Sequence, residues 1–211
     1  MTPDWLDISV PTRPGMVHWP GDPAYELRRV ADMERGDVAN VSLLTLGAHT
    51  GTHVDAPLHF VRDGLPIDAA PIDALIGTVR VIAIDDADSI QAVELERHAL
   101  KRGERVLFKT RNSAGAWDRA EFVEDFVHIR ADAARLLVER GVRTVGVDYL
   151  SVGGYRRDGI ETHQIMLGAG MWLIEGLNLA GVEPGEYELV CLPLKLIGVE
   201  ASPARAVIRP L

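Results

Sequence analysis

The sequence contains only one cysteine in 211 residues, Cys191, so the chain cannot form an internal disulfide. Cys191 lies in the apolar run 189–194, which favours a buried packing role over a nucleophilic one. Long hydrophobic runs are also missing, because this run contains Pro193, ends at Lys195 and is too short to span a bilayer. These absences exclude a disulfide-held fold and favour a soluble protein with its own apolar core.

Net positive charge is the second property that the sequence lacks. Its 22 lysines and arginines are outnumbered by 31 aspartates and glutamates, which gives a net charge of −9. This charge opposes binding to nucleic acid and to anionic membranes, so we expect neither as a partner and expect a small-molecule substrate. Residues 1–7 lack the basic and apolar regions of a secretory signal, so we expect a cytoplasmic protein.

Linkers and repeats are also absent from the sequence. No stretch rich in glycine and serine or in charge divides the chain, and 47% of its residues are hydrophobic. A chain of this length can build one sizeable core, so we expect residues 1–211 to form a single domain.

Histidine, in contrast, is concentrated in one short segment. Three of the seven histidines, His49, His53 and His59, lie within eleven residues, together with Asp55. Two β-branched residues and a glycine at 50–52 disfavour a helix here. In an extended chain these four residues, all at odd positions, project to the same side.

Imidazole nitrogen and carboxylate oxygen together suit zinc, manganese or iron. Three such ligands leave a coordination position for water, as a catalytic site requires. The alternatives are a polar surface loop or histidines that are hydrogen-bonded in the core. The density of histidine favours a metal site, and the pattern alone leaves His59 as a fourth ligand, a residue supporting the ligands, or a proton carrier.

The remaining pattern predicts an α/β fold with many strands and a few helices. Alternating or β-branched residues predict strands at 5–10, 40–48, 78–84, 105–110, 142–147, 171–177, 186–194 and 204–209. Apolar residues at helical spacing and helix-ending glycines predict helices at 92–102, 132–140 and 163–167, the last with Thr162 as its N-cap. Residues 11–23 and 61–76 are expected to be loops, the second with one helical turn.

Other polar and aromatic residues are candidates for the site. Glu175 falls on the apolar face of its predicted strand, where a carboxylate needs a metal partner unless solvent reaches the strand end. Asp148 ends another predicted strand, where it either orients a ligand or forms a turn. Residues 109–112 face either the substrate or, by default, solvent. Trp19 either borders a pocket or covers the edge of the core.

The segment from His49 to His59 resembles the signature of the metal-dependent cyclase family, which includes bacterial kynurenine formamidases and isatin hydrolases. Seven positions agree at fixed spacing: His49, Gly51, Thr52, His53, Asp55, Pro57 and His59. The resemblance extends over nearly the whole chain, to residues 19–22, His163, Glu175, 192–195 and 201–207. It implies the family's fold, a swivelling β/β/α domain with a mixed sheet.

The resemblance also implies two metal positions, whose ligands are His49, His53, Asp55, His163 and Glu175. In the family, the aspartate that matches Asp55 bridges both ions, and the histidine that matches His59 is the acid and base. The matching tryptophan lies beside the substrate, which gives Trp19 a substrate-binding role. We therefore expect two divalent ions per chain, zinc or else manganese, in a homodimer.

The implied activity is hydrolysis of an amide bond in a small molecule. Two divalent ions with Asp55, Glu175 and a hydroxide keep about one positive charge to meet the oxyanion of a tetrahedral intermediate. The resemblance and Trp19 favour N-formyl-L-kynurenine, cleaved to L-kynurenine and formate. Residues 153–157 depart from the matching segment of kynurenine formamidases, so isatin-like lactams and other cyclic amides stay open. A non-catalytic metal-binding protein is a further alternative, although the intact His59 favours an enzyme.

Overall fold

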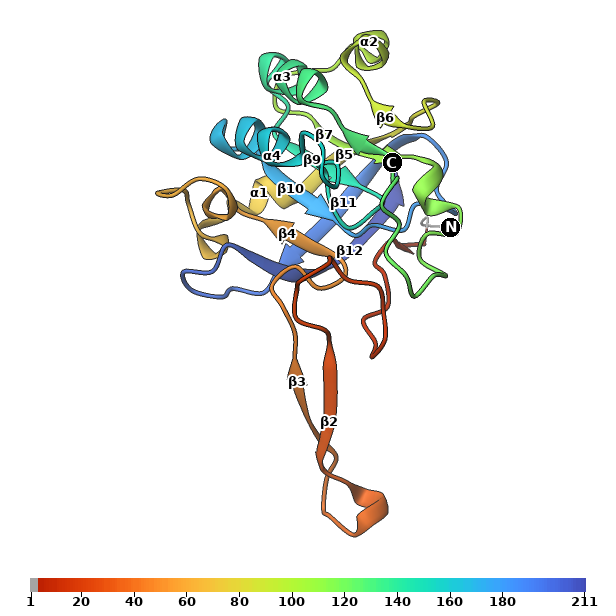
Figure 1. The fold of residues 1–211 in the computed structure, drawn as a ribbon, viewed down its shortest axis with the longest axis vertical. Coiled ribbons are helices and arrows are strands. Elements are labelled where there is room, and N and C mark those ends of the chain that lie inside the picture. The colour runs from red at the N-terminus through yellow and green to blue at the C-terminus, as the bar shows by residue number, and fades with distance from the viewer. Residues whose placement is uncertain (1–3) are drawn as a thin grey trace.

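A mixed β-sheet that closes on itself forms the centre of the computed structural model, which describes residues 4–211 (Figure 1). In spatial order its strands are β1 (Leu6–Asp7), β12 (Ala201–Pro210), β11 (Gly185–Pro193), β5 (Ile76–Ala83), β7 (Arg105–Lys109), β9 (Thr144–Val147), β10 (Trp172–Glu175) and β4 (His53–Asp55). Strand β12 also pairs with β4, so seven of these strands close into a barrel and β1 lies outside it. Strands β5, β7, β9 and β10 are parallel neighbours, and the other pairs are antiparallel.

Side chains that alternate along the strands fill the interior of the barrel. Val54, Leu107, Ile174 and Leu189 belong to one buried apolar cluster, together with Cys191. Cys191 has no exposed surface, which confirms its predicted packing role. The neighbours of these residues along each strand point to the outside, which is the period-2 arrangement of a strand.

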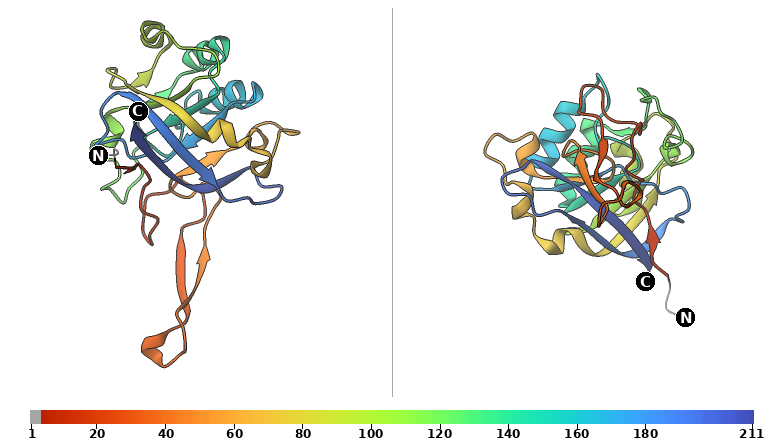
Figure 2. Two further views of the ribbon diagram at one scale, coloured as in Figure 1. Left: turned by 180° about the vertical axis from the view of Figure 1, so that it is seen from behind. Right: turned by 90° about the horizontal axis from the view of Figure 1, so that it is seen from below.

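Three helices cover the outer face of the parallel strands (Figures 1 and 2). They are α2 (Ala92–Leu95), α3 (Ala131–Arg140) and α4 (Gly159–Gly168). Phe108 and Val145, on the outer face of the barrel, form a second buried cluster with Leu137 of α3 and Met166 of α4. Helix α3 ends at Gly141, whose φ of 71° favours glycine, as predicted for this stop.

The remaining elements are short. The one-turn helix α1 (Ile72–Leu75) is the helical turn predicted within residues 61–76. A small parallel pair joins β6 (Ser89–Ile90) to β8 (His128–Ile129). The 3-10 turns are η1 (Met33–Arg35), η2 (Pro57–His59), η3 (Ile67–Ala69), η4 (Glu96–His98) and η5 (Arg111–Ser113). In the part of the chain that the structure describes, no helix has the length and apolar character needed to cross a membrane.

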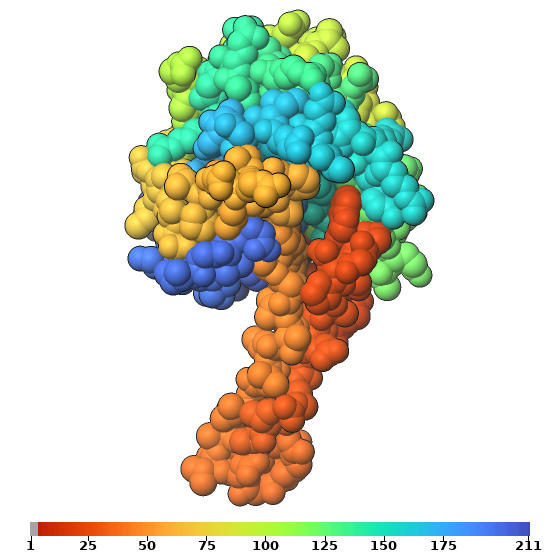
Figure 3. Space-filling model, turned by 60° about the vertical axis from the view of Figure 1, so that its left-hand side comes forward, coloured from red at the N-terminus to blue at the C-terminus, as the bar shows by residue number. Residues whose placement is uncertain are grey.

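A two-stranded arm projects from the barrel (Figures 1 and 3). It consists of β2 (Glu26–Ala31) and β3 (Val41–Thr45), which pair only with each other. The strand predicted at 40–48 was therefore too long, because β3 ends at Thr45. Gly47 lies where the chain leaves the ribbon for a turn that leads to His49. The alternating pattern predicted a strand but not the element against which the strand would pack.

Other predicted boundaries also differ from the structure. The strand at 5–10 is reduced to β1 and an isolated bridge at Ser9, and the helix at 92–102 ends as η4. Helix α4 begins at Gly159 after Asp158, so Thr162 is not its N-cap. Thr162 lies within the helix, and its buried hydroxyl donates to the Ile129 carbonyl. The α/β class with a mixed sheet and few helices is confirmed, and the swivelling β/β/α type stays a prediction.

Candidate metal centre

The register of two barrel strands brings a histidine and a glutamate together. His53 on β4 lies directly opposite Glu175 on β10 in the antiparallel ladder. Their neighbours Val54 and Ile174 fill the barrel, so His53 and Glu175 lie on its outer face. His53 Nε2 is 3.3 Å from Glu175 Oε2, and both side chains are buried. Helix α4 contributes His163, whose Nε2 is 3.3 Å from Glu175 Oε1.

His49 and His59 reach the centre from turns at the two ends of β4. The extended arrangement expected from His49 to His59 holds only for residues 53–55, so that expectation was wrong. Gly51 has a φ of 67° and makes a turn before the strand, whereas Pro57 begins η2, which carries His59. The ligands therefore surround one point and do not line one face of a strand.

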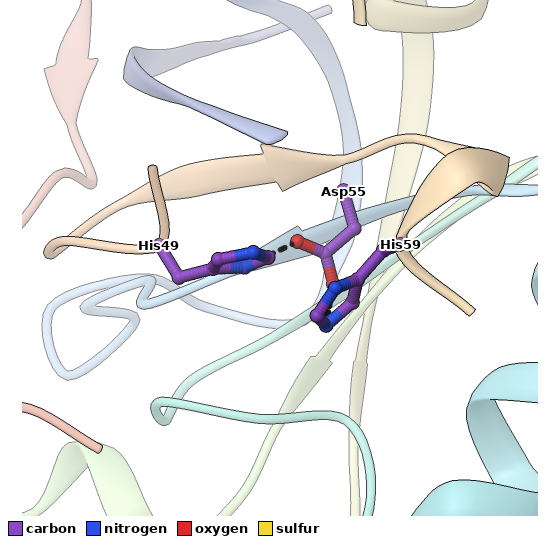
Figure 4. Close-up of side chains that lie close together, drawn as sticks. All are labelled: His49, Asp55 and His59. Atoms are coloured by element: carbon purple, nitrogen blue, oxygen red, sulfur yellow. Dashed lines mark ion pairs between the residues drawn. The ribbon is translucent and has the colours of Figure 1, made fainter. Parts of the chain in front are cut away.

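Asp55 occupies that central point (Figure 4). Its Oδ1 is 2.9 Å from His49 Nδ1 and 3.4 Å from His53 Nε2, and its Oδ2 is 4.0 Å from the Nε2 atoms of both His59 and His163. Asp55 has no exposed surface, and neither of its oxygens has a well-aligned hydrogen bond within residues 4–211. The Nε2 of His53 also lacks a hydrogen-bond partner there. Such buried atoms are unfavourable unless another ligand satisfies them.

Backbone carbonyls orient two of the histidine rings. His53 Nδ1–H donates to the Gly51 carbonyl at 2.9 Å, and His163 Nδ1–H donates to the Gly159 carbonyl at 2.7 Å. A carbonyl can only accept, so each Nδ1 carries a proton and each Nε2 is left to face the centre. The Val152 backbone N–H donates to Glu175 Oε1 at 2.6 Å and holds that carboxylate in place. Supporting bonds of this kind are usual around metal ligands.

The two buried carboxylates create a demand for positive charge. Burial acts to lower the pKa of His53, but the contacts with Asp55 and Glu175 outweigh it and raise that pKa to about 10. Burial acts to raise the pKa of Asp55, but His49 and His53 hold it well below its usual range. For the more open His59, burial is the largest influence and lowers the pKa, although the charge of Asp55 acts against it.

The donor set fits a divalent metal ion. Candidate ligand atoms gather in two groups that share Asp55: the first contains His49 and His59, and the second contains His53 and Glu175. Within each group the atoms lie within 4.8 Å of one another. Nitrogen and carboxylate oxygen donors of this kind suit zinc or manganese. How the histidines divide between two ions, and whether His59 is a ligand or a proton carrier, stay predictions.

A cavity of about 190 Å³ opens onto the centre. Trp19 lines it, together with His49, His59, His163 and Glu175. The half-buried Trp19 ring makes edge-on contacts with Phe122 and Tyr155, at centroid distances of 5.2 and 5.4 Å. Tyr155 belongs to residues 153–157, the segment that differs from the matching segment of kynurenine formamidases, so this segment supports a wall of the cavity.

The sequence interpretation missed four residues that line this cavity: Asp22, Phe60, Leu150 and Ser151. Phe60 stacks on His163 with ring centroids 4.5 Å apart, and its position directly after His59 was the available signal. Asp22 lies in the segment 19–22 that matched the family. Leu150 and Ser151 follow the parallel strand β9, and ligands often bind at the carboxyl ends of parallel strands.

Asp148 belongs to neither group of candidate ligands and does not line the cavity, and its carboxylate makes structural contacts instead. Its carboxylate is buried and accepts hydrogen bonds from the backbone N–H and the hydroxyl of both Thr110 and Ser113. Within residues 109–112, Thr110 and Asn112 are buried whereas Arg111 is exposed, so the default of a solvated surface holds for only part of this segment. Burial raises the pKa of Asp148, although the donated hydrogen bonds act against it.

The fold and the donor set define an α/β protein built on a closed β-barrel, with a site for a divalent metal on the outer face of that barrel. The Cyclase family model, described as "Putative cyclase", matches residues 6–153. Kynurenine formamidases of Bacillus cereus and Bacillus mycoides are each 38% identical to the chain over 210 residues, which span 100% of this chain and 99% of each relative. The chain therefore belongs to the Cyclase family, which confirms the family predicted from the resemblance.

Solved structures share the fold. A predicted metal-dependent hydrolase from Bacillus stearothermophilus superposes with a TM-score of 0.84 at 32% identity, covering 97% of both chains. Isatin hydrolase A from Ralstonia solanacearum superposes with a TM-score of 0.85 at 22% identity, covering 97% of this chain and 91% of the other. The second likeness concerns the fold alone.

Proposed function

We propose that residues 1–211 form a single metal-dependent hydrolase domain that cleaves N-formyl-L-kynurenine to L-kynurenine and formate. The observation that carries the proposal is Asp55, a fully buried carboxylate whose oxygens lie among histidine nitrogens without a well-aligned hydrogen bond within residues 4–211. The full-length kynurenine formamidase relatives supply the substrate class. Two zinc ions per chain, with manganese as the alternative metal, and a cytoplasmic location belong to the same proposal.

In this proposal the ions are held by His49, His53, Asp55, His163 and Glu175. Bound ions supply polarisation of the formyl carbonyl and a lower pKa for the attacking water. His59 takes a proton from that water as its oxygen bonds to the formyl carbon. The same ring then gives the proton to the aniline nitrogen as the C–N bond breaks. The His59 side chain is 27% exposed at the cavity, and Trp19 offers an aromatic surface to the substrate ring.

An isatin-like lactam is the second candidate substrate. Two observations favour it: the fold shared with isatin hydrolase A and the contact of Tyr155, from the departing segment, with Trp19. The same proton transfers apply, but the C–N bond that breaks is in a ring, so both product groups stay on one molecule. A non-catalytic member of the family would bind the metal without turning over either amide.

The substrate assay compares N-formyl-L-kynurenine, formanilide and isatin with protein loaded with zinc or with manganese. We expect N-formyl-L-kynurenine to give the highest kcat/KM. If isatin alone is turned over, the proposed substrate is the lactam and not the formamide. Loaded protein that turns over none of the three would overturn the hydrolase proposal.

Two variants separate metal binding from proton transfer. We expect Asp55→Asn to lose both metal and activity, because it removes the shared ligand. His59→Ala should keep its metal while kcat falls by about 10²–10⁴, the usual effect of a positioned acid or base. His98→Ala changes a half-buried histidine on η4, outside the centre, and is the matched control. Metal loss in His59→Ala, measured by mass spectrometry, would make His59 a ligand.

A further inference from the structure

The cavity at the metal centre contains one acidic residue, Asp22, that neither metal binding nor proton transfer uses. Every other titratable residue of the lining belongs to the centre itself: His49, His59, His163 and Glu175. The remaining lining is mostly apolar, so a free carboxylate is chemically distinct from the wall around it. A charged group placed in this way at a substrate cavity is suited to recognising an opposite charge on a bound molecule.

A tight turn fixes Asp22 beside Trp19. The Asp22 backbone N–H donates to the Trp19 carbonyl at 3.0 Å, and Gly21 within the turn has a φ of 99°, which favours glycine. The Asp22 side chain is half-buried, and within residues 4–211 its carboxylate has no ion-pair partner and accepts no hydrogen bond. Solvent or a bound molecule must therefore satisfy this carboxylate.

Two other parts of the cavity fix how a substrate of the proposed reaction lies. The metal centre takes the amide carbonyl, and Trp19 offers an aromatic surface whose ring is held by Phe122 and Tyr155. Because Asp22 follows Trp19 by a single turn, a substituent on a ring that lies on Trp19 is within reach of the carboxylate. Asp22 thus meets a part of the substrate away from the bond that breaks.

The charge of Asp22 discriminates between the two candidate substrates. N-formyl-L-kynurenine carries an α-ammonium group on the chain next to its formamide, whereas isatin has no ionic group. An ammonium group gives the carboxylate a charge-assisted hydrogen bond. A neutral lactam displaces water from the carboxylate without replacing its hydrogen bonds, which is unfavourable.

We propose that Asp22 binds the α-ammonium group of an amino-acid substrate whose aromatic ring lies on Trp19. This inference rests on the proposed hydrolase function and adds the group by which the substrate is selected. The contact is the same in the bound substrate and in the transition state, because the ammonium group takes no part in the reaction. Asp22 is therefore a specificity residue.

Kinetics with zinc-loaded protein test the contact. The two substrates are N-formyl-L-kynurenine and its des-amino analogue, in which hydrogen replaces the α-ammonium group. Asp22→Asn should raise KM for N-formyl-L-kynurenine by about 10–100-fold, the effect of a hydrogen bond to a charged group, while kcat stays close to wild type. KM for the des-amino analogue should change much less. Equal losses for both substrates would overturn the proposal.

Equilibrium binding tests the same contact without turnover. L-Kynurenine keeps the α-ammonium group and lacks the formyl group. In calorimetry it should bind wild-type protein about 10-fold or more tighter than its own des-amino analogue, and Asp22→Asn should remove this difference. Asp85→Asn is the matched control, because Asp85 is exposed after β5 and does not line the cavity.

The outcomes separate this inference from the proposed function. Protein that turns over neither formamide contradicts the hydrolase, whereas equal binding of L-kynurenine and its des-amino analogue contradicts the role of Asp22. Metal content, measured by mass spectrometry, should be the same in wild type, Asp22→Asn and Asp85→Asn. Metal lost only from Asp22→Asn would make Asp22 a support of the metal centre instead.

Discussion

At the scale of the residue, the centre depends on a position where a side chain must be absent. Gly176 follows Glu175 with a φ of 73°, and a Cβ there would lie 2.2 Å from the Gly51 carbonyl oxygen. That oxygen accepts the His53 Nδ1–H, so crowding at position 176 is transmitted to the His53 ring. The glycine therefore controls both the chain path and the orientation of a candidate ligand.

We expect Gly176→Ala to lower the free energy of unfolding by at least about 2 kcal/mol, because left-handed strain and a steric clash add together. It should also reduce metal content, since the support of His53 moves. Gly168→Ala is the control, because a Cβ there would meet nothing within 4 Å. That control should stay within about 0.5 kcal/mol of wild type in urea denaturation. Equal stability of the two variants would contradict this account.

At the scale of the element, a single carboxylate ties two strand ends together. Asp148 follows β9, whereas its hydrogen-bond donors Thr110 and Ser113 follow β7. The loops after these neighbouring parallel strands are thereby locked to each other. One of them continues through Leu150 and Ser151, which line the cavity.

Removing the Asp148 carboxylate should destabilise both loops that it joins. We expect Asp148→Ala to cost about 2–5 kcal/mol of unfolding free energy, because two buried backbone N–H groups lose their acceptor. Asp148→Asn should cost less, since one oxygen remains. Asp63→Ala, at an exposed position, should be nearly neutral. A loss for Asp148→Ala no larger than that of Asp63→Ala in urea denaturation would show that the hydrogen bonds contribute little.

At the scale of the whole molecule, the barrel and the metal centre share their strands. Strand β4 pairs with both β10 and β12 and so closes the barrel, and it also carries His53 and Asp55. Without a metal ion the two buried carboxylates at this closure have only the neighbouring histidines to supply positive charge. Metal binding should therefore stabilise the complete fold and not only the site.

We expect chelation to lower Tm by roughly 5–10 °C, the change for a ligand present at about 100 times its Kd in a protein of this size. Returning zinc should restore the original Tm. Asp55→Asn should respond much less to both treatments, because its centre has lost the shared ligand. Scanning calorimetry with metal analysis makes the measurement, and an unchanged Tm after verified removal would refute the coupling.

The sequence alone determined the features that depend on short stretches of chain. The segment from His49 to His59 identified candidate ligands because a dense histidine and aspartate pattern is local information. Apolar neighbours predicted the burial of Cys191, and a helical stripe with Gly141 predicted α3 and its stop. These features follow from the chemistry and periodicity of neighbouring residues.

Only the tertiary structure decided which distant residues meet. Glu175 became a partner of His53 through the register of β10 on β4, and the barrel closed because β12 also reaches β4. The alternating residues near position 45 predict a strand, but the same pattern would suit a strand packed on the core or a strand of the exposed arm. A period of two specifies which side chains share a face, but what covers that face depends on contacts between segments far apart in the sequence.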